Sequence, residues 1–386
     1  MTITGKGSEE MRVLMLGGTG TIGQRAVKEL CSFAEIQSIT LAARSREKYH
    51  NLREQVEKGQ DKLCYAEIDL NDGPELGGVM QGHDLVANAA GPSYRYEYPL
   101  AQAAIRAGVN YISICDDFDA AQRVFTLNEE ARRKGLTILT GMGWTPGLSN
   151  LMVRAGADRL KAVDKIKIAW AGGTADTMGM AVILHVLHIF SGQVPSFRGG
   201  SHQMIPAGSG RERVTFPEPI GSINVYTVGH PEPITLGRYF PQAQEITLKG
   251  GINQELLNVL ALLSRRLGIL KGQTRRRLTA TFLQKTLPFW RRLAGPKSPD
   301  SGIRVDLVGL SREGRDAHLT YSAAGPMDVL TAVPLSIAIR EMARGNMDKT
   351  GVLAPEAPGA LNPHTFFTAL EERGVQIRKG SFSCEN

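Results

Sequence analysis

The chain has 386 residues, 42% of them hydrophobic and 22% charged, which is typical of an ordinary globular protein with about two domains. No apolar run reaches the roughly 20 residues that a bilayer-spanning helix needs. The net charge of +7 is concentrated between residues 253 and 300, so it indicates a local basic patch and does not imply a general nucleic-acid-binding surface.

The N-terminal residues and the cysteines indicate the cell compartment. The first ten residues read as a disordered tail and contain no apolar signal core, which argues against secretion. The four cysteines, Cys31, Cys64, Cys115 and Cys384, include no CxxC pair. Such a pattern favours reduced thiols in a cytoplasmic protein and provides no metal-binding framework.

The stretch from Met11 to Gly23, MRVLMLGGTGTIG, is typical of a dinucleotide-binding βαβ unit. An apolar strand precedes three glycines, and a helical pattern follows them. We expect Gly17 to turn the chain and Gly20, with Thr21 and Ile22, to bring backbone N–H groups to a pyrophosphate. Gly23 would let the helix pack on the strand. The alternative is a tight turn that binds nothing.

The second predicted strand, 36–43, ends in Ala43-Arg44-Ser45-Arg46. In this region an acidic residue would bind the ribose 2′-hydroxyl of NAD, but no acid is present. An acid would repel a 2′-phosphate, whereas a guanidinium pairs with it, so we expect Arg44 and Ser45 to favour NADP over NAD. In the alternative interpretation, these arginines are solvated loop charges.

Further strands are predicted at 63–68, 84–90, 110–114 and 136–139, with helices between them. This alternation predicts an α/β fold with a doubly wound parallel (Rossmann) sheet, which binds ligands beyond the carboxyl ends of its strands. Asp69 at one such end would approach the adenine, or else cap the next helix. Ala89, Ala90, Gly91 and Pro92 at another would border the nicotinamide.

The second half of the chain predicts a different arrangement. Helices are expected at 148–160, 178–190, 254–267, 275–293, 327–344 and 363–373, with short strands at 213–216, 223–227, 234–236 and 245–248 and a hairpin over 303–323. We expect a Rossmann domain at 11–146, completed by 325–380. An inserted α/β domain with a mixed sheet, 147–324, would carry the basic helical segment 253–300.

Five motifs resemble the saccharopine dehydrogenase / lysine dehydrogenase-like family of NAD(P) oxidoreductases: GGTGTIG, NAAGPSYRYEYPL, AGVNYISICDD, GMGWTPGLSNLM and GHPEPITLGRYFP. The resemblance implies a split Rossmann domain and an inserted domain that covers the substrate and supports dimerisation. It also implies oxidation of a C–N bond or reduction of an imine, on amino-acid or polyamine-like substrates. Pro146, in the turn Trp144-Thr145-Pro146-Gly147, matches the family's turn between the domains and would border the site.

Hydride transfer needs a proton donor or acceptor close to the nicotinamide. The candidates at the strand ends are Asp116, Asp117, Tyr94 and Tyr96. A carboxylate can hold a substrate ammonium and accept its proton. Alternatively, Asp117 or Asp119 caps the following helix.

His230 and Glu232, in GHPEP, are the candidates from the second domain, although a lone histidine is more often structural. His185 and His188 lie in an apolar helical pattern and are interpreted as core or interface residues. The spacings support no metal site. No tyrosine has a lysine four residues on, which argues against a short-chain reductase.

The basic segment, with Leu256, Leu263, Phe282, Phe289 and Trp290 among its arginines, has three possible roles. It could be a packed helix with a solvated basic side, a lid over an apolar substrate or subunit interface, or a membrane contact, which we favour least.

For the whole chain we expect a homodimeric, cytoplasmic NADP-dependent oxidoreductase that acts on a small amine or imine substrate and binds no nucleic acid. The alternatives are an NADPH-dependent reductase of a carbonyl or activated double bond in a larger apolar substrate, and a non-catalytic nucleotide-binding protein.

Overall fold

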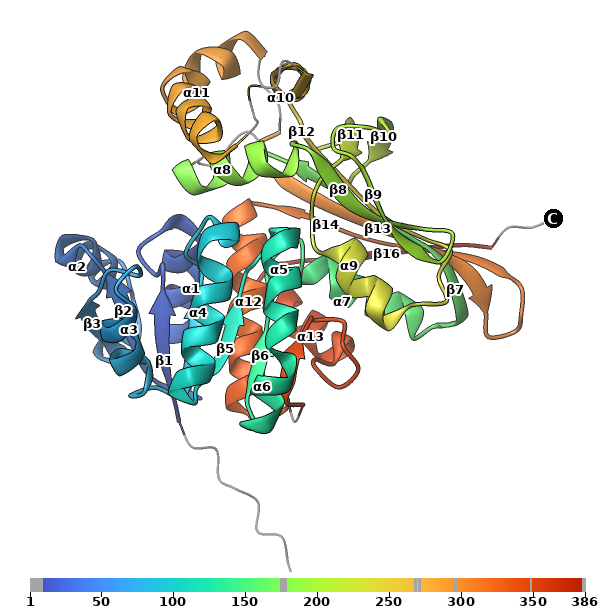
Figure 1. Cartoon of the computed structure of the whole chain (residues 1–386). Coiled ribbons are helices and arrows are strands. Elements are labelled where there is room, and N and C mark those ends of the chain that lie inside the picture. Colours follow the sequence, from blue (N-terminus) through green and yellow to red (C-terminus); the bar gives the residue numbers. More distant parts are fainter. Residues whose placement is uncertain are drawn as a thin grey trace, which may run out of the picture.

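The computed structural model describes residues 10–173, 179–266, 269, 272–294, 298–347 and 349–383. Residues 1–9 of the expected tail, position 267 of the predicted basic helix and Cys384 lie outside the described residues. Figure 1 shows a first α/β layer built mainly by the N-terminal part of the chain and a large second sheet beside it.

The first sheet has seven strands within the described residues, and all of its strand pairs are parallel. The strand order is β15-β6-β5-β4-β1-β2-β3. The strands are β1 (Met11–Leu16), β2 (Ile36–Ala43), β3 (Leu63–Glu67), β4 (Leu85–Asn88), β5 (Asn110–Ser113), β6 (Thr137–Leu139) and β15 (Gly351–Leu353). The predicted doubly wound parallel sheet is therefore confirmed.

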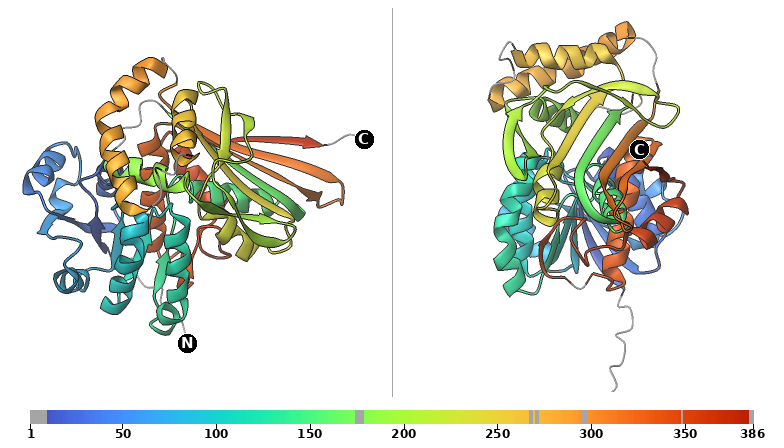
Figure 2. Two further views of the ribbon diagram at one scale, coloured as in Figure 1. Left: turned by 45° about the horizontal axis from the view of Figure 1, so that its top comes forward. Right: turned by 90° about the vertical axis from the view of Figure 1, so that its right-hand side faces the viewer.

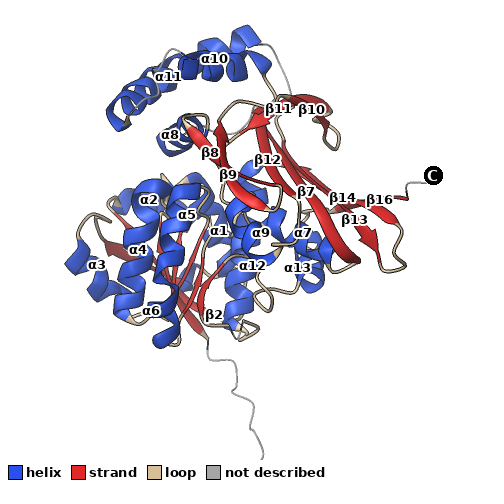
Figure 3. Ribbon diagram, turned by 45° about the vertical axis from the view of Figure 1, so that its right-hand side comes forward, coloured by secondary structure: helices blue, strands red, loops and turns tan. Residues whose placement is uncertain are grey.

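Helices cover both faces of this sheet (Figure 3). They include α1 (Thr21–Cys31), α2 (Arg46–Glu54), α3 (Gly73–Met80), α4 (Ser93–Ala107), α5 (Phe118–Val124), α6 (Asn128–Arg133) and α12 (Met327–Ala343), with the short 3-10 turns η1 (Gln60–Lys62) and η2 (Phe125–Leu127). The helices α7 (Leu148–Ala157) and α13 (Pro363–Glu371) contact each other, and α7 packs on the second sheet, which is described below. The C-terminal α12 packs on α1, where the Ser336 hydroxyl donates to the Ala26 carbonyl at 3.3 Å. The chain therefore returns to its first sheet after leaving it.

The second sheet has nine strands in the described part of the chain and is mixed. Its central strand, β7, pairs with β12 in parallel and with β13 antiparallel. The strands are β7 (Leu160–Gly172), β8 (Gln193–Arg198), β9 (Ser201–Pro206), β10 (Glu212–Thr215), β11 (Ser222–Thr227), β12 (Glu245–Ile252), β13 (Ser301–Ser311), β14 (Asp316–Gly325) and β16 (Arg378–Ser383). The expected second mixed-sheet unit is thus confirmed, and the last strand, β16, joins it by pairing with β14.

Besides α7, the described residues of this second part form the helices α8 (Met180–Ile189), α9 (Glu232–Tyr239), α10 (Glu255–Arg266) and α11 (Gln273–Ala294). The strand predicted over 234–236 is wrong, because these residues lie inside α9. Pro231 at its N-cap and Pro233 in its first turn suit a helix start, where a missing N–H costs nothing. The hairpin of β8 and β9 was not predicted, since its Gly- and Ser-rich sequence lacks a clear alternation.

The helices α10 and α11 form a separate upper layer (Figure 2). Helix α11 packs on α8, and α8 lies between that layer and the first domain.

Candidate active site

One elongated cavity of about 550 Å³ runs along the carboxyl ends of the first sheet. Its wall begins at the ends of β2 and β3, passes the glycine turn after β1 and the end of β4, and continues to the loops after β5 and β6. Residues of β7, α8 and the loop before α9 close it from the other side. This is where a doubly wound sheet binds a dinucleotide, so the cavity combines a nucleotide groove with a chamber roofed by the second domain.

The glycine turn fits a pyrophosphate. Gly17 has φ of 75°, and a Cβ there would lie 2.6 Å from the Ala90 nitrogen, so only glycine allows the turn to approach the end of β4. A Cβ at Gly23 would lie 2.1 Å from the Gly17 carbonyl oxygen, which explains the close packing of α1 on the turn. Among the described residues, no side chain caps the N-terminus of α1 and its first turn contains no acid. The N–H groups of that turn therefore remain available to an anion.

The far end of the cavity is lined by Arg44, Asp69 and Asn71. Asp69 accepts hydrogen bonds from the backbone N–H of Asn71 at 3.0 Å and from its side-chain amide at 2.6 Å. These bonds, together with the charges of Arg44 and Arg95, lower the pKa of Asp69. An exposed guanidinium at this end suits a 2′-phosphate.

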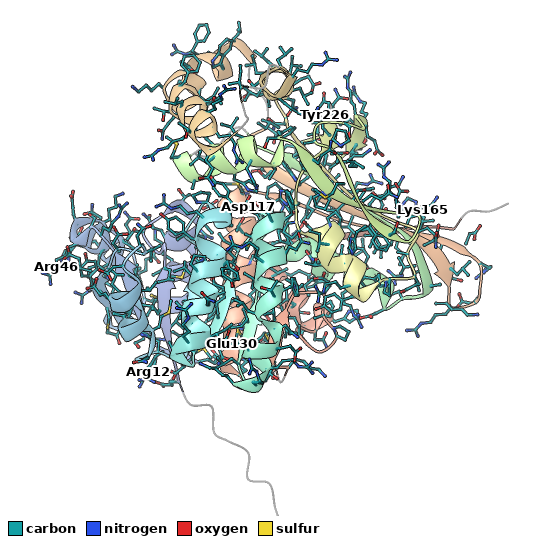
Figure 4. The ribbon with its side chains drawn as sticks, viewed as in Figure 1. Arg12, Arg46, Asp117, Glu130, Lys165 and Tyr226 are labelled. Atoms are coloured by element: carbon teal, nitrogen blue, oxygen red, sulfur yellow. The ribbon has the colours of Figure 1, made fainter. Side chains whose placement is uncertain are left out.

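The opposite end contains a histidine held between two carboxylates. The Nδ1 atom of His185 lies 2.9 Å from Asp117 Oδ1, and its Nε2 atom lies 3.4 Å from Asp116 Oδ2. Figure 4 shows the labelled Asp117 at the boundary between the first domain and α8. The other Asp117 oxygen accepts the Tyr94 backbone N–H at 2.7 Å, and Asp116 accepts the Ser93 hydroxyl at 3.1 Å. With acceptors at both ring nitrogens, His185 is best suited to the doubly protonated form.

The charges of this group follow from its geometry. Burial opposes the imidazolium, but Asp116 and Asp117 outweigh it and raise the pKa of His185 to about 9. Burial also opposes ionisation of Asp117, but its bonds to His185 and Tyr94 outweigh burial and lower its pKa. Burial raises the pKa of Asp116 despite His185 nearby. Of the two carboxylates, Asp116 has a partly exposed side chain and lines the cavity, whereas Asp117 is fully buried.

His230 lies beside this group and also lines the cavity. The side chain is 2% exposed, and its ring lies edge-on to that of His185 with the ring centroids 5.3 Å apart. Neither ring nitrogen has a hydrogen-bond partner within the described residues. Glu232 stands behind it, with Oε2 3.6 Å from His230 Nδ1. The other Glu232 oxygen accepts the hydroxyls of Thr145 at 2.5 Å and Ser149 at 3.1 Å. The Glu232 carboxylate is therefore fixed beside a histidine whose other neighbours among the described residues are the rings of Trp170 and His185.

Most of the predicted cofactor residues line the cavity: Gly17, Gly20, Thr21, Ile22, Arg44, Asp69, Ala89, Ala90, Gly91 and Pro92. Three do not. Gly23 packs behind the turn, Ser45 accepts the Lys48 N–H as the cap of α2, and Pro146 packs against Gly141 within the loop after β6.

Of the predicted catalytic residues, the structure brings Asp116 and His230 together at the cavity wall, with Asp117 and Glu232 behind them. Tyr94 contributes its backbone N–H, and its ring stacks beside His188 with the centroids 4.8 Å apart. In the alternative, Asp117 or Asp119 caps α5. Asp117 occupies the N-cap position but makes no capping bond with its side chain, whereas Asp119 Oδ1 accepts the first-turn N–H of Ala120 at 3.0 Å.

The interpretation of His185 as a core or interface residue is also wrong, since it lines the cavity. His188 bonds Asp119 at 3.2 Å and contacts Arg276 of α11. The signal was present in the sequence: residues three apart share one face of a helix, so two histidines on an apolar helix needed polar partners. Trp144 and Trp170, which also line the cavity, gave no comparable signal.

Comparison with known proteins agrees with this geometry. Residues 13–139 match the family model described as the saccharopine dehydrogenase NADP binding domain. This part of the chain is an NADP-binding domain of the saccharopine dehydrogenase type. The expected NADP-binding domain, and the resemblance that predicted it, are thereby confirmed.

One solved structure shows the same fold for the chain as a whole. An apo saccharopine dehydrogenase (L-Glu forming) from Saccharomyces cerevisiae is 15% identical, with a TM-score of 0.69 over 97% of this chain and 100% of that one. An amine dehydrogenase from Mycobacterium smegmatis is 10% identical, with a TM-score of 0.44 over 89% of this chain and 95% of that one.

The carboxylates of Asp116 and Asp117 and a ring nitrogen of His185 lie within 4.8 Å of one another, a grouping that a metal ion could also occupy. A histidine must lose a proton before it binds a metal. Because the two carboxylates raise the pKa of His185 to about 9, the ring holds its protons near neutral pH, and the ion pair competes with any metal.

Proposed function

We propose that this chain is an NADP-dependent oxidoreductase that transfers hydride between NADP(H) and the amine or imine carbon of an amino-acid-like substrate. The observation that carries the proposal is the group of Asp116, His185 and His230 at one end of a cavity whose other end has the glycine turn and Arg44. NADP, when bound, supplies or accepts the hydride.

The side chains of the chamber have distinct proposed roles. The partly exposed Asp116 carboxylate would accept a hydrogen bond from a substrate ammonium. His185, held from both sides, would fix the orientation of Asp116 and limit the negative charge in the chamber. The ring nitrogens of His230 have no hydrogen-bond partner among the described residues and a carboxylate lies behind the ring, so His230 would take or deliver the proton at the substrate nitrogen.

One observation favours a second candidate, the reduction of a carbonyl or activated double bond in a larger apolar substrate. The chamber has apolar walls from Trp144, Trp170, Met180, Ile252 and Met327. Within the described residues, Arg44 is the one Arg or Lys that lines the cavity, and it lies at the opposite end. A substrate carboxylate would thus have only the histidines as cationic partners.

A pair of substrate panels separates the two candidates. Amino acids and polyamines are offered with NADP⁺, and ketones, aldehydes and enones with NADPH, while absorbance at the nicotinamide band is followed. Turnover confined to the amines supports the proposal, and turnover confined to the carbonyls or enones supports the second candidate.

A non-catalytic nucleotide-binding role would give a third result. NADPH would stabilise the protein against heat, but no panel member would be turned over, and Asp116→Asn would not alter either observation.

A further inference from the structure

The long helix α11 exposes a stripe of large apolar side chains. Leu278, Phe282, Phe289 and Leu293 are 68%, 59%, 62% and 63% exposed. At 100° per residue, their spacing of 4, 11 and 15 residues from Leu278 places all four within an arc of about 60°. A solvated helix side normally carries polar residues, so this stripe requires an explanation.

The stripe is not the packed side of the helix. A different face, with the buried Ala280 and the partly buried Leu283, packs against Ile183 and Leu187 of α8. Helix α11 thus has one apolar face packed on α8 and a second one that stays exposed among the described residues. A packed helix with a purely solvated basic side, the plainest expectation from the sequence, does not describe this second face.

The neighbouring helix α10 also exposes large apolar side chains. Val259 and Leu263, one turn apart, are 39% and 46% exposed. The helices α10 and α11 contact each other and together form the upper layer of the molecule (Figure 2). We call these six exposed residues, Val259, Leu263, Leu278, Phe282, Phe289 and Leu293, the α10–α11 face.

The α10–α11 face is surrounded by positive charge. Between residues 255 and 294 the sequence contains nine Lys or Arg and a single acid, Glu255. On the helical projection Arg275 falls within the arc of the apolar stripe and Lys285 lies at its edge. Both side chains are exposed. Any surface that covers this face must therefore match apolar groups and a concentrated positive charge at the same time.

This requirement decides which kind of surface can cover the α10–α11 face. A second copy of the chain would bring two strongly basic faces together, which like-charge repulsion opposes. A nucleic acid would neutralise the charge but leave the apolar stripe unsatisfied. An anionic bilayer surface offers both acyl chains and negative headgroups.

We propose that the α10–α11 face docks on the surface of an anionic phospholipid bilayer. Docking is peripheral: no helix among the described residues combines the length and apolar character needed to cross a membrane. Because α11 packs on α8, and α8 carries His185 at the chamber, docking would hold the roof of the cavity next to the lipid.

Co-sedimentation of the full chain with vesicles tests the proposal. Vesicles of phosphatidylcholine alone are compared with vesicles containing phosphatidylglycerol, each at about 0.05 M and 1 M salt, where screening lengths differ severalfold. We expect the chain to sediment with the anionic vesicles at low salt, to bind them less at high salt, and not to bind phosphatidylcholine.

Two double variants, each with its own control, distinguish vesicle binding by this face from non-specific adsorption. Phe282→Ser with Phe289→Ser removes half of the apolar stripe on α11, and its control is Leu310→Ser, an exposed apolar residue at the far end of β13. Arg275→Gln with Lys285→Gln removes two charges, and its control, Arg312→Gln with Arg315→Gln, removes two exposed charges from the turn after β13. We expect each α11 double variant to bind anionic vesicles roughly tenfold or more weakly, and the controls to bind as the natural chain does.

Circular dichroism and thermal unfolding show whether the variants remain folded. The proposal is overturned if the natural chain does not sediment with anionic vesicles at low salt, or if it binds duplex DNA in place of vesicles. Equal losses in the α11 variants and their controls would also overturn it, as would a concentration-dependent dimer abolished by the Phe variants.

Discussion

At the scale of single residues, the site depends on how His185 is held. Its two ring nitrogens face Asp117 and Asp116, and this fixes both the position and the charge of the ring. The sequence indicated the two aspartates, because they follow a buried strand, but not their partner, which comes from a helix about 70 residues away. Pairing across such a distance depends on tertiary packing, which periodicity does not reveal.

The raised pKa of His185 predicts how stability changes with pH. A group whose pKa is higher in the folded state stabilises it fully below the unfolded value of 6.5, and this stabilisation is lost as pH rises to about 9. The shift corresponds to an effect on the order of 3 kcal/mol. We expect the free energy of unfolding in urea to fall between pH 6.5 and 9, and His185→Gln to lose most of this dependence. Parallel pH profiles for the two proteins would contradict the ion-pair assignment.

His230 allows a test of the proton-transfer role. With the substrate that the panels identify, His230→Asn should lower kcat about a hundredfold or more, the usual contribution of a general acid or base. The Kd for NADPH should stay the same, because His230 lies at the chamber end of the cavity. The control is His202→Asn, whose ring contacts Phe197 outside the cavity. Unchanged kcat in His230→Asn would remove the histidine from the mechanism.

At the scale of elements, the turn from β1 into α1 was predictable almost to the residue. Glycine is the residue that a positive φ and a close backbone approach require, so local sequence decides this structure. The strand predicted over 234–236 failed for an equally local reason, because its β-prone residues follow a proline pair that begins a helix. The β8–β9 hairpin forms because β12 offers an edge for β8 to pair with, which the sequence of the hairpin does not encode.

Two glycine substitutions inside helices test the turn. In Gly23→Ala the new methyl group would meet the Gly17 carbonyl at 2.1 Å, so the turn must shift. We expect a loss of about 1–3 kcal/mol in stability and of measurable NADPH binding. Gly78→Ala, in α3 with no atom within 4 Å of the new methyl group, should be neutral or slightly stabilising. Calorimetric titration with NADPH and thermal unfolding measure both effects. Full NADPH affinity in Gly23→Ala would argue against a pyrophosphate at the turn.

Two arginines after β2, Arg44 and Arg46, allow a matched test of the preference for NADPH over NADH. Arg44 lines the cavity, whereas Arg46 lies over the Tyr65 ring at 5.9 Å and does not line it. We expect Arg44→Ala to weaken NADPH binding about tenfold or more while leaving the Kd for NADH unchanged, because a bidentate phosphate contact is lost. Arg46→Ala should change neither. Equal loss of both cofactors in Arg44→Ala would contradict a role in recognising the 2′-phosphate.

At the scale of the whole molecule, the cavity exists only because two units of the chain meet. The first sheet provides the nucleotide groove, and β7, α8 and the loop before α9 close the chamber over its end. Sequence reasoning predicted both sheets and the return of the chain to the first one. It located Asp116 and His230 separately but not their meeting with His185 and the two tryptophans, since that meeting depends on how the second unit lies over the first.

The most direct test of the account is a crystal structure of the chain with NADPH. We predict the pyrophosphate at the turn of Gly17–Ile22, the 2′-phosphate beside Arg44, and the nicotinamide at Ala89–Pro92, facing the chamber of Asp116, His185 and His230. A nicotinamide directed away from that chamber, or a cavity left empty at saturating NADPH, would contradict the proposed oxidoreductase.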